Sequence, residues 1–198
     1  MPAPRLILAS RSPRRVELLR DAGFVFDAVP ANIDEDAYAD TLAPVGVAEF
    51  LARGKAEIVA HTHSDFVVLA ADTIVALGDT LLGKPEDSDH ARWMLNQLAG
   101  SQHMVASGVC VIHRASGRVD VAHSVSTVSM RPLTPREIDL YVASGDWRGK
   151  AGGYGIQDHD PFVTNMGGSL TNIVGLPMEL AVPMLAAAGV KPASAALD

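Results

Sequence analysis

The chain has 198 residues, of which 48% are hydrophobic and 20% charged, so it can bury a sizeable core and is unlike a disordered segment. Its formal net charge of −7 argues against a broad nucleic-acid surface, but a few local cations can still hold a small anion. The first residues lack a signal-peptide pattern, and no apolar run approaches the ~20 residues that span a membrane. We therefore expect one cytoplasmic domain over residues 1–198, with two lobes on a shared sheet and without nucleic-acid or membrane partners.

The first predicted elements are a buried strand, a tight turn and a helix. Residues 6–9 are apolar, Ser12 is a good helix-capping residue, and Pro13 suits the first helical position. A glycine ends the apolar stripe of this helix. A partly alternating strand at residues 24–29 and an amphipathic helix at residues 44–61 follow.

The turn after the first strand brings Ser10, Arg14 and Arg15 to the N-terminus of the first helix. Unpaired backbone N–H groups and a partial positive charge at such an end suit an anion, above all a phosphate. The two arginines add fixed charge and forked hydrogen-bond donors. The plainer alternative is a solvated basic helix start, and this segment alone does not decide between the two.

Residues 66–71 give the strongest buried-strand signal, and they lead directly into Asp72 and Thr73. Ligand sites in α/β sheets lie outside the carboxyl ends of strands, so Asp72 is the best candidate to orient a water or hold a divalent cation. A structural aspartate that accepts backbone hydrogen bonds is the alternative. Glu35, in an acidic loop, is by itself typical of a solvated patch, but with Asp72 it could complete a site for a hard cation.

Residues 78–84 match the first seven positions of a Walker A loop. The eighth position is Pro85, where a Ser or Thr hydroxyl should hold magnesium, and the segment contains a hairpin turn at 78–79 and a return strand at 80–82. A Walker A loop instead leads from a strand into a helix, so we exclude this function. Lys84 remains a candidate point charge ahead of a rigid proline.

The remaining predicted elements mix hairpins with helices. They are a helix at 88–99 capped by Ser88, strands at 103–114 and 119–130, a helix opened by the capping box Thr134–Glu137 and ending at 144, short strands at 154–157 and 162–164, a turn at 167–169, and a last helix at 177–188. This mixture predicts an α/β fold with a mixed sheet flanked by helices rather than a purely parallel winding.

Residues 149–157 form a glycine-rich loop whose backbone could approach a ligand closely, and Gln157 offers both a donor and an acceptor to a base edge. A structural hairpin loop is the competing explanation. The single cysteine, Cys110, has apolar neighbours and no evident base, which is typical of a packed core thiol. The seven histidines show no metal-binding spacing.

Six separated motifs, none of them specific alone, together resemble the Maf family of nucleotide pyrophosphatases over nearly the whole chain. They are Leu-Ala-Ser-x-Ser-Pro-Arg-Arg at 8–15, Ala-Asp-Thr at 71–73, Gly-Lys-Pro at 83–85, Lys-Ala-Gly-Gly-Tyr-Gly-Ile-Gln at 150–157, Gly-Ser at 168–169 and Val-Gly-Leu-Pro at 174–177. The resemblance implies an elongated mixed sheet with two lobes around a deep central cleft, similar to the inosine triphosphatase architecture. It also implies a nucleoside triphosphate substrate, cleaved to the monophosphate and pyrophosphate with a divalent cation (Mg2+ or Mn2+), and it allows a homodimer.

The resemblance also implies roles for individual residues, carried over by position. Asp72 matches the catalytic carboxylate of the family, and Arg14, Thr73 and Gln157 match its base-selecting positions. The other matched cleft residues are Ser10, Arg15, Lys55 and Lys84 for phosphate, and Glu35 with Asp72 for the metal. We expect Asp72 to orient or deprotonate the attacking water.

The segment from Tyr154 to Gln157 resembles the branch of the family that prefers dTTP and UTP. A second branch, which prefers 7-methyl-GTP, carries a Phe-Lys-Ser-Glu-like segment that this chain lacks, and it is the alternative within the family. Two residues depart from the pyrimidine-branch pattern: Asp158 stands where glycine is usual, and Leu170 stands where an aromatic residue usually follows Gly-Ser. A non-catalytic nucleotide-binding regulator of cell division is the alternative of another class.

Overall fold

One mixed sheet carries the fold in the computed structural model, which describes residues 4–33, 42–157 and 162–193. Its strands are β1 (Arg5–Leu8), β2 (Phe26–Ala28), β3 (Phe66–Leu77), β4 (Thr80–Leu82), β5 (Gln102–His113), β6 (Arg118–Met130) and β7 (Val163–Gly167), in spatial order β2-β1-β3-β5-β6-β7 with β4 paired to β3. β1 runs parallel to β2 and β3, whereas the other pairings are antiparallel. The predicted mixed α/β sheet is confirmed.

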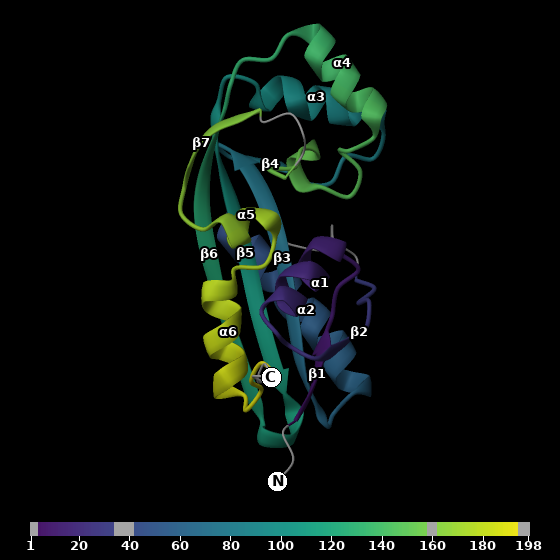
Figure 1. The fold of residues 1–198 in the computed structure, drawn as a ribbon, viewed down its shortest axis with the longest axis vertical. Helices are drawn as coiled ribbons and strands as arrows, with labels where there is room; N and C mark the ends of the chain where they lie inside the picture. Colours follow the sequence, from purple (N-terminus) through teal and green to yellow (C-terminus); the bar gives the residue numbers. More distant parts are fainter. Residues whose placement is uncertain (1–3, 34–41, 158–161, 194–198) are drawn as a thin grey trace, which may run out of the picture.

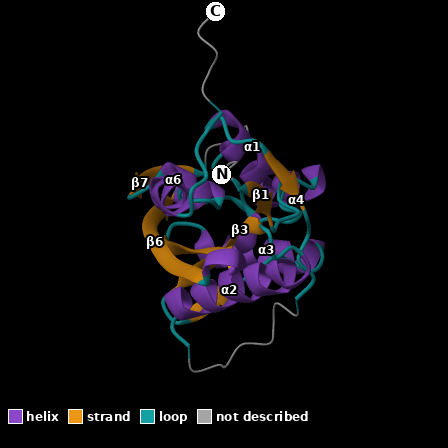
Figure 2. Ribbon diagram, turned by 90° about the horizontal axis from the view of Figure 1, so that it is seen from below, coloured by secondary structure: helices purple, strands orange, loops and turns teal. Residues whose placement is uncertain are grey.

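Helices cover both faces of the sheet. They are α1 (Pro13–Asp21), α2 (Pro44–Thr62), α3 (Ser88–Leu98), α4 (Pro135–Ser144), α5 (Leu170–Val174) and α6 (Met178–Ala187), with short 3-10 helices η1 (Arg114–Ser116) and η2 (Ala151–Gly153). Figure 2 shows α2 on one side of β3 and β6, and α1 and α6 on the other. None of the helices described here is long and apolar enough to cross a membrane.

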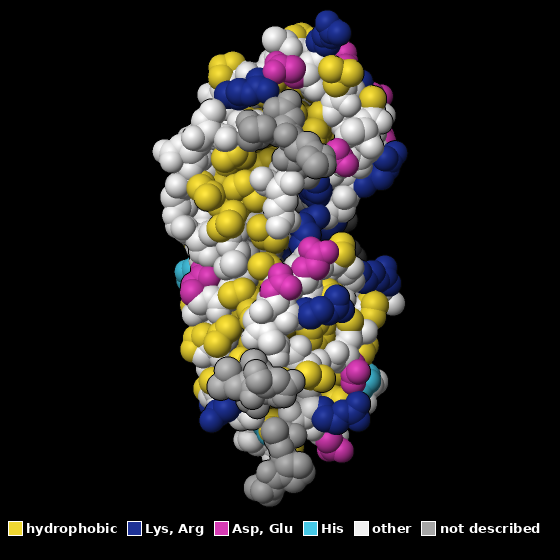
Figure 3. All heavy atoms as spheres, in the orientation of Figure 1, with side chains coloured by type: hydrophobic (Ala, Val, Ile, Leu, Met, Phe, Trp, Pro, Cys, Tyr) yellow, Lys and Arg dark blue, Asp and Glu magenta, His cyan; other side chains and the backbone are white. Residues whose placement is uncertain are grey.

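The molecule is elongated and has two lobes, through both of which β3, β5 and β6 run (Figure 1). The lower lobe holds β1, β2, α1, α2 and α6, and the upper lobe holds β4, α3, α4 and η2. Figure 3 shows the surface hollowed between the lobes on the right, with lysine and arginine side chains gathered in the hollow. The expected elongated sheet with a cleft between two lobes is confirmed.

One edge of β3 changes partner at the hollow. β1 pairs with Phe66–Leu69 and β4 pairs with Val75–Leu77, whereas β5 pairs along nearly the whole opposite edge. In the described part of the chain, no strand pairs with residues 70–74 on the edge between β1 and β4. Asp72 and Thr73 therefore lie where β3 borders the gap between the lobes.

The segment 154–157 and the start of α3 differ from the sequence predictions. Residues 154–157 form no strand, because Gly152 and Gly153 both adopt a left-handed φ of 71° and redirect the chain before it. The N-cap of α3 is Asp87, whose Oδ1 accepts a 2.8 Å hydrogen bond from the backbone N–H three residues on, and not Ser88. The predicted capping box at the start of α4 is confirmed.

Candidate functional site

Lys55 and Asp72 form a buried ion pair on the sheet face that α2 covers. Lys55 Nζ lies 2.5 Å from Asp72 Oδ1, and the two side chains are 8% and 9% exposed. Asp72 points to this face because it continues the alternation of Val68 and Ala70, which pack against α2. Either charge without the other would carry a large desolvation cost at this depth.

The close approach of α2 to the sheet depends on Gly108, the residue of β5 that pairs with Asp72. A Cβ at this position would lie 2.3 Å from the Ala48 carbonyl oxygen in α2, which is closer than any side chain can come. The absence of a side chain therefore lets α2 lie low on β5. Lys55, about two turns further along α2, can then reach Asp72.

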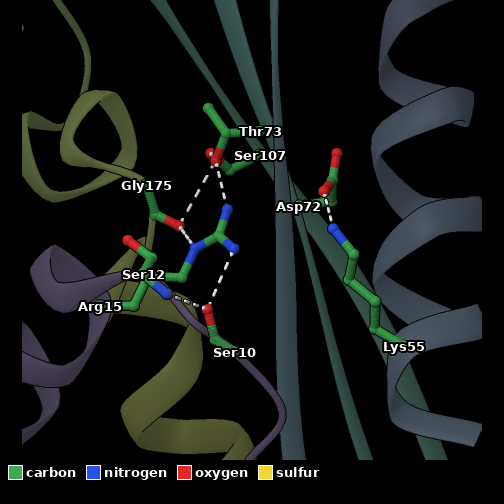
Figure 4. A network of polar contacts seen from close by, with 8 residues as sticks. All are labelled: Ser10, Ser12, Arg15, Lys55, Asp72, Thr73, Ser107 and Gly175. Atoms are coloured by element: carbon green, nitrogen blue, oxygen red, sulfur yellow. Dashed lines mark hydrogen bonds and ion pairs between the residues drawn. The ribbon is translucent and has the colours of Figure 1, made fainter. Parts of the chain in front are cut away.

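Thr73 points to the opposite face of the sheet, where it meets Arg15 (Figure 4). The Arg15 guanidinium donates from Nη2 to Thr73 Oγ1 at 3.1 Å and from Nε to the Gly175 carbonyl at 2.7 Å. Thr73 Oγ1 also lies 2.8 Å from Ser107 Oγ and 3.4 Å from the Gly175 carbonyl oxygen. Consecutive residues of β3 thus anchor two polar clusters on opposite faces.

Ser10 connects the Arg15 cluster to the first turn of α1. Its Oγ accepts hydrogen bonds from the Ser12 backbone N–H at 3.1 Å and from Arg15 Nη1 at 3.4 Å. Ser12 occupies the N-cap position of α1 as predicted, but its side chain makes no capping hydrogen bond. Because Ser12 does not cap the N–H groups of the first turn, this end of α1 remains suited to an anion.

Sequence reasoning missed α5, the short helix that closes this face. Asn172 of α5 is fully buried, and its Nδ2 donates to Ser126 Oγ at 2.8 Å. Ser107 Oγ donates to the Asn172 carbonyl at 3.1 Å, so the polar cluster on this face continues into α5. The available signal was Ser169, an N-cap residue whose Oγ accepts from the Asn172 backbone N–H at 3.1 Å.

Arg14, Lys84 and Gln157 lie apart from these two clusters. Arg14 Nη2 lies 3.4 Å from the Gly149 carbonyl oxygen, which joins α1 of the lower lobe to the glycine-rich loop of the upper lobe. The Gly152 N–H donates at 2.9 Å to the carbonyl of the residue before Lys84. Lys84 and Gln157 are both exposed, and this hydrogen bond holds the segments that carry them side by side.

Two metal ligands are predicted, Asp72 and Glu35. Asp72 belongs to the residues that the structure describes, whereas Glu35 lies in the segment 34–41, outside the described residues. The described ranges contain no group of three or more His, Cys, Asp or Glu side chains that could hold an ion. Magnesium in nucleotide sites commonly takes one or two carboxylates and completes its coordination with water and substrate phosphates. The single carboxylate of Asp72 fits a hard cation bound in that way.

A family model described as a Maf-like protein matches residues 5–188, and the match includes every site segment described above. The chain belongs to the Maf family. The family expected from the six motifs is therefore confirmed. In this Maf chain, the motifs at 8–15 and 71–73 supply the Arg15 cluster and Asp72, and those at 83–85 and 150–157 contact each other.

Curated relatives of this Maf chain are named dTTP/UTP pyrophosphatase. One from Salinibacter ruber is 46% identical over 175 residues, covering 87% of this chain and 85% of the relative. Others from Pelotomaculum thermopropionicum and Rhodospirillum rubrum are 41% and 44% identical, covering 91% and 94% of this chain and 94% and 89% of the relatives. These relatives carry the name of the branch that the segment 154–157 resembles.

Proposed function

We propose that this Maf chain is a nucleoside triphosphate pyrophosphatase that cleaves the α–β phosphoanhydride of dTTP and UTP, or of modified pyrimidine nucleotides. The observation that carries the proposal is the buried Lys55–Asp72 pair at the edge of β3 that borders the hollow, in a chain whose relatives bear the name of this activity. A carboxylate beside several cations suits the hydrolysis of a polyanion, because it can handle a water proton while the cations hold phosphate.

In the proposed reaction, water attacks the α-phosphorus. A new P–O bond forms, and the bond from the α-phosphorus to the bridging oxygen breaks with its electron pair leaving on pyrophosphate. Asp72 accepts a proton from the attacking water. Arg15, with the N-terminus of α1, holds phosphate oxygens, and Lys55 and Lys84 offset the charge that develops on the leaving pyrophosphate. Arg14 belongs with the residues that select the base.

Two contributions complete the proposal. Mg2+ or Mn2+, held by Asp72 and Glu35, supplies further neutralisation of the triphosphate charge when it is bound. Thr73 and Gln157 contact the base. The hydroxyl contacts of Thr73 hold its side chain in one orientation, and the Gln157 amide offers a donor and an acceptor to the edge that thymine and uracil share.

The homodimer stays a prediction, which sedimentation of the purified chain tests.

The proposal is tested by incubating the purified protein with dTTP and Mg2+ and quantifying the products by ion-exchange chromatography. We expect dTMP and pyrophosphate in equal amounts and no product after chelation of the metal with EDTA. Orthophosphate with dTDP would instead identify a phosphatase, and nucleotide binding without turnover would favour the non-catalytic regulator.

The same assay with UTP, CTP, GTP and 7-methyl-GTP tests the branch assignment. We expect the largest kcat/KM values for dTTP and UTP. A preference for 7-methyl-GTP would move the chain to the other branch without changing the reaction.

A further inference from the structure

His103 is a buried histidine that the proposed reaction does not use. It lies on β5 in the upper lobe and is 3% exposed. Its Nε2 lies 2.6 Å from the hydroxyl oxygen of Tyr154, and the two rings meet edge to face with centroids 5.4 Å apart. Burying an imidazole in an apolar core costs free energy unless its ring nitrogens are hydrogen-bonded.

Both partners are neutral at ordinary pH. Burial lowers the pKa of His103 to about 4, and burial raises the pKa of Tyr154 above its usual value. Within the described part of the chain, His103 Nδ1 has no hydrogen-bond partner. The Tyr154 hydroxyl is therefore the polar contact that accounts for an imidazole at this position.

Tyr154 belongs to the glycine-rich loop and stands three residues before Gln157. The loop is also held by hydrogen bonds at Gly149 and Gly152, but there it contributes only backbone atoms. The structure describes all of residues 151–157, and the buried ones are Gly152, Gly153 and Tyr154. Tyr154 is therefore the one buried residue of this segment that has a side chain. Its ring and hydroxyl are thus the side-chain anchor of the segment that ends at Gln157.

We propose that His103 is a positioning residue for base selection: its hydrogen bond to the Tyr154 hydroxyl holds the glycine-rich loop in the orientation that presents Gln157 to the base. The proposal rests on the proposed function, and it adds a residue that touches neither base nor phosphate. His103 lies five residues along β5 from Gly108, the partner of Asp72 in the sheet, so it acts away from the reacting phosphate.

Single substitutions at either residue remove the hydrogen bond between His103 and Tyr154. Tyr154→Phe removes the hydroxyl alone, and His103→Leu removes its partner. We expect either change to raise KM for dTTP and UTP about tenfold, the equivalent of one buried hydrogen bond, and to lower the preference for dTTP over CTP by a similar factor. The kcat values should stay within about twofold, because the phosphate chemistry is untouched. His103→Gln, whose amide reaches the same place as Nε2, should restore most of the preference.

The double variant separates positioning from stability. His103→Leu with Tyr154→Phe leaves two apolar partners and no orphaned polar group, so its melting temperature should exceed that of either single variant. The preference for dTTP over CTP should nevertheless stay as low as in the single variants. Ile138→Val, in the same core cluster on α4, is the control that lowers stability without changing this preference.

Each outcome supports or overturns the proposal. Recovery of the dTTP preference together with stability in the double variant, or unchanged KM values in Tyr154→Phe, would show that the pair is only structural. Equilibrium binding of α,β-methylene-dTTP and its cytidine counterpart gives a readout that does not need turnover. If the wild type binds but does not hydrolyse, the proposed function fails, whereas a tenfold loss of binding preference in Tyr154→Phe still supports the role of His103. If the wild type binds neither analogue, both proposals fail.

Discussion

A buried carboxylate and a buried ammonium stabilise each other only while both are present. Lys55 and Asp72 satisfy this condition at 2.5 Å in a setting that exposes less than a tenth of either side chain. Such pairs contribute little net stability compared with apolar residues, but removal of one partner is costly. We therefore attribute the presence of this pair to the reaction that we propose for Asp72.

Asp72→Asn keeps the shape of the side chain and removes its charge. We expect kcat for dTTP to fall by a factor of about 100 to 10,000, the range typical of losing a general base. Asp27→Asn is the matched control, because Asp27 forms an exposed ion pair with Arg5 and should leave kcat unchanged. Near-normal turnover of Asp72→Asn would contradict the assignment.

The same substitution also removes the Asp72 carboxylate charge that lies beside the buried Lys55 ammonium. We expect the free energy of unfolding of Asp72→Asn to fall by about 3–5 kcal/mol in urea titrations. Adding Lys55→Met should restore most of this loss and leave the activity low. Activity that returns together with stability would mean that the pair is structural.

The protonation of His103 links stability to pH. Its pKa in the folded chain is about 4, below the ordinary 6.5, so the unfolded chain binds a proton between these values that the folded chain does not. Stability is therefore lost as the pH falls from about 7 to 4, by about 3 kcal/mol for a shift of this size. Urea titrations at three pH values should show a steeper loss for the wild type than for His103→Gln. Parallel losses would mean that His103 titrates alike in the folded and unfolded chain.

The position of α2 on the sheet depends on the absence of a side chain at Gly108. Gly108→Ala would place a Cβ against the Ala48 carbonyl and lift α2 from β5, which separates Lys55 from Asp72. We expect both kcat and stability to fall, the latter by about 1–3 kcal/mol as in other overpacked cores. Circular dichroism and steady-state kinetics measure the two effects.

Gly54 is the control on the same helix. It lies in the interior of α2, and among the residues that the structure describes a Cβ there would meet only the Ile33 side chain, at 3.9 Å. Gly54→Ala should raise stability by up to about 1 kcal/mol and leave kcat unchanged. Similar losses in both variants would show that α2 does not depend on the close contact at Gly108.

The two lobes share the strands β3, β5 and β6, so we predict that they unfold in one transition. The two tryptophans allow a direct test, because Trp93 lies on α3 and Trp147 packs in the core of the upper lobe. Their fluorescence reports the upper lobe, whereas circular dichroism at 222 nm also reports α2, α1 and α6. Coincident melting curves are expected, and separate midpoints would show that the lobes are independent domains.

The parts of the fold that sequence could predict are those that neighbouring residues determine. The strand, turn and helix from residue 6 to 21, the hairpin at 78–79 and the capping box of α4 follow from local apolar pattern and turn chemistry, and all are present. Residues 170–174 have no such pattern. They become helical through Ser169 and through Asn172 contacts with β6, which lies more than 40 residues away.

For the candidate site, the sequence motifs supply the proposed members but not the way in which they are arranged. The motifs pointed to Ser10, Arg15 and Thr73. No spacing in the sequence predicts that Arg15 donates a hydrogen bond to the Gly175 carbonyl, 160 residues later. The His103–Tyr154 pair likewise joins a strand to a loop 51 residues apart. Contacts of this length are determined by the tertiary fold, which local sequence does not record.

The carboxylate of Asp72 and the hydroxyl of Thr73 belong to consecutive residues, whose Cα atoms a trans peptide keeps about 3.8 Å apart. Opening or closing of the lobes cannot alter this covalent spacing. Since successive side chains of a strand alternate between faces, inserting or deleting one residue ahead of them in β3 would exchange carboxylate and hydroxyl between the α2 side and the α1 side. We therefore expect the length of the strand ahead of this dipeptide to tolerate no single-residue change, even where its individual apolar side chains can be exchanged.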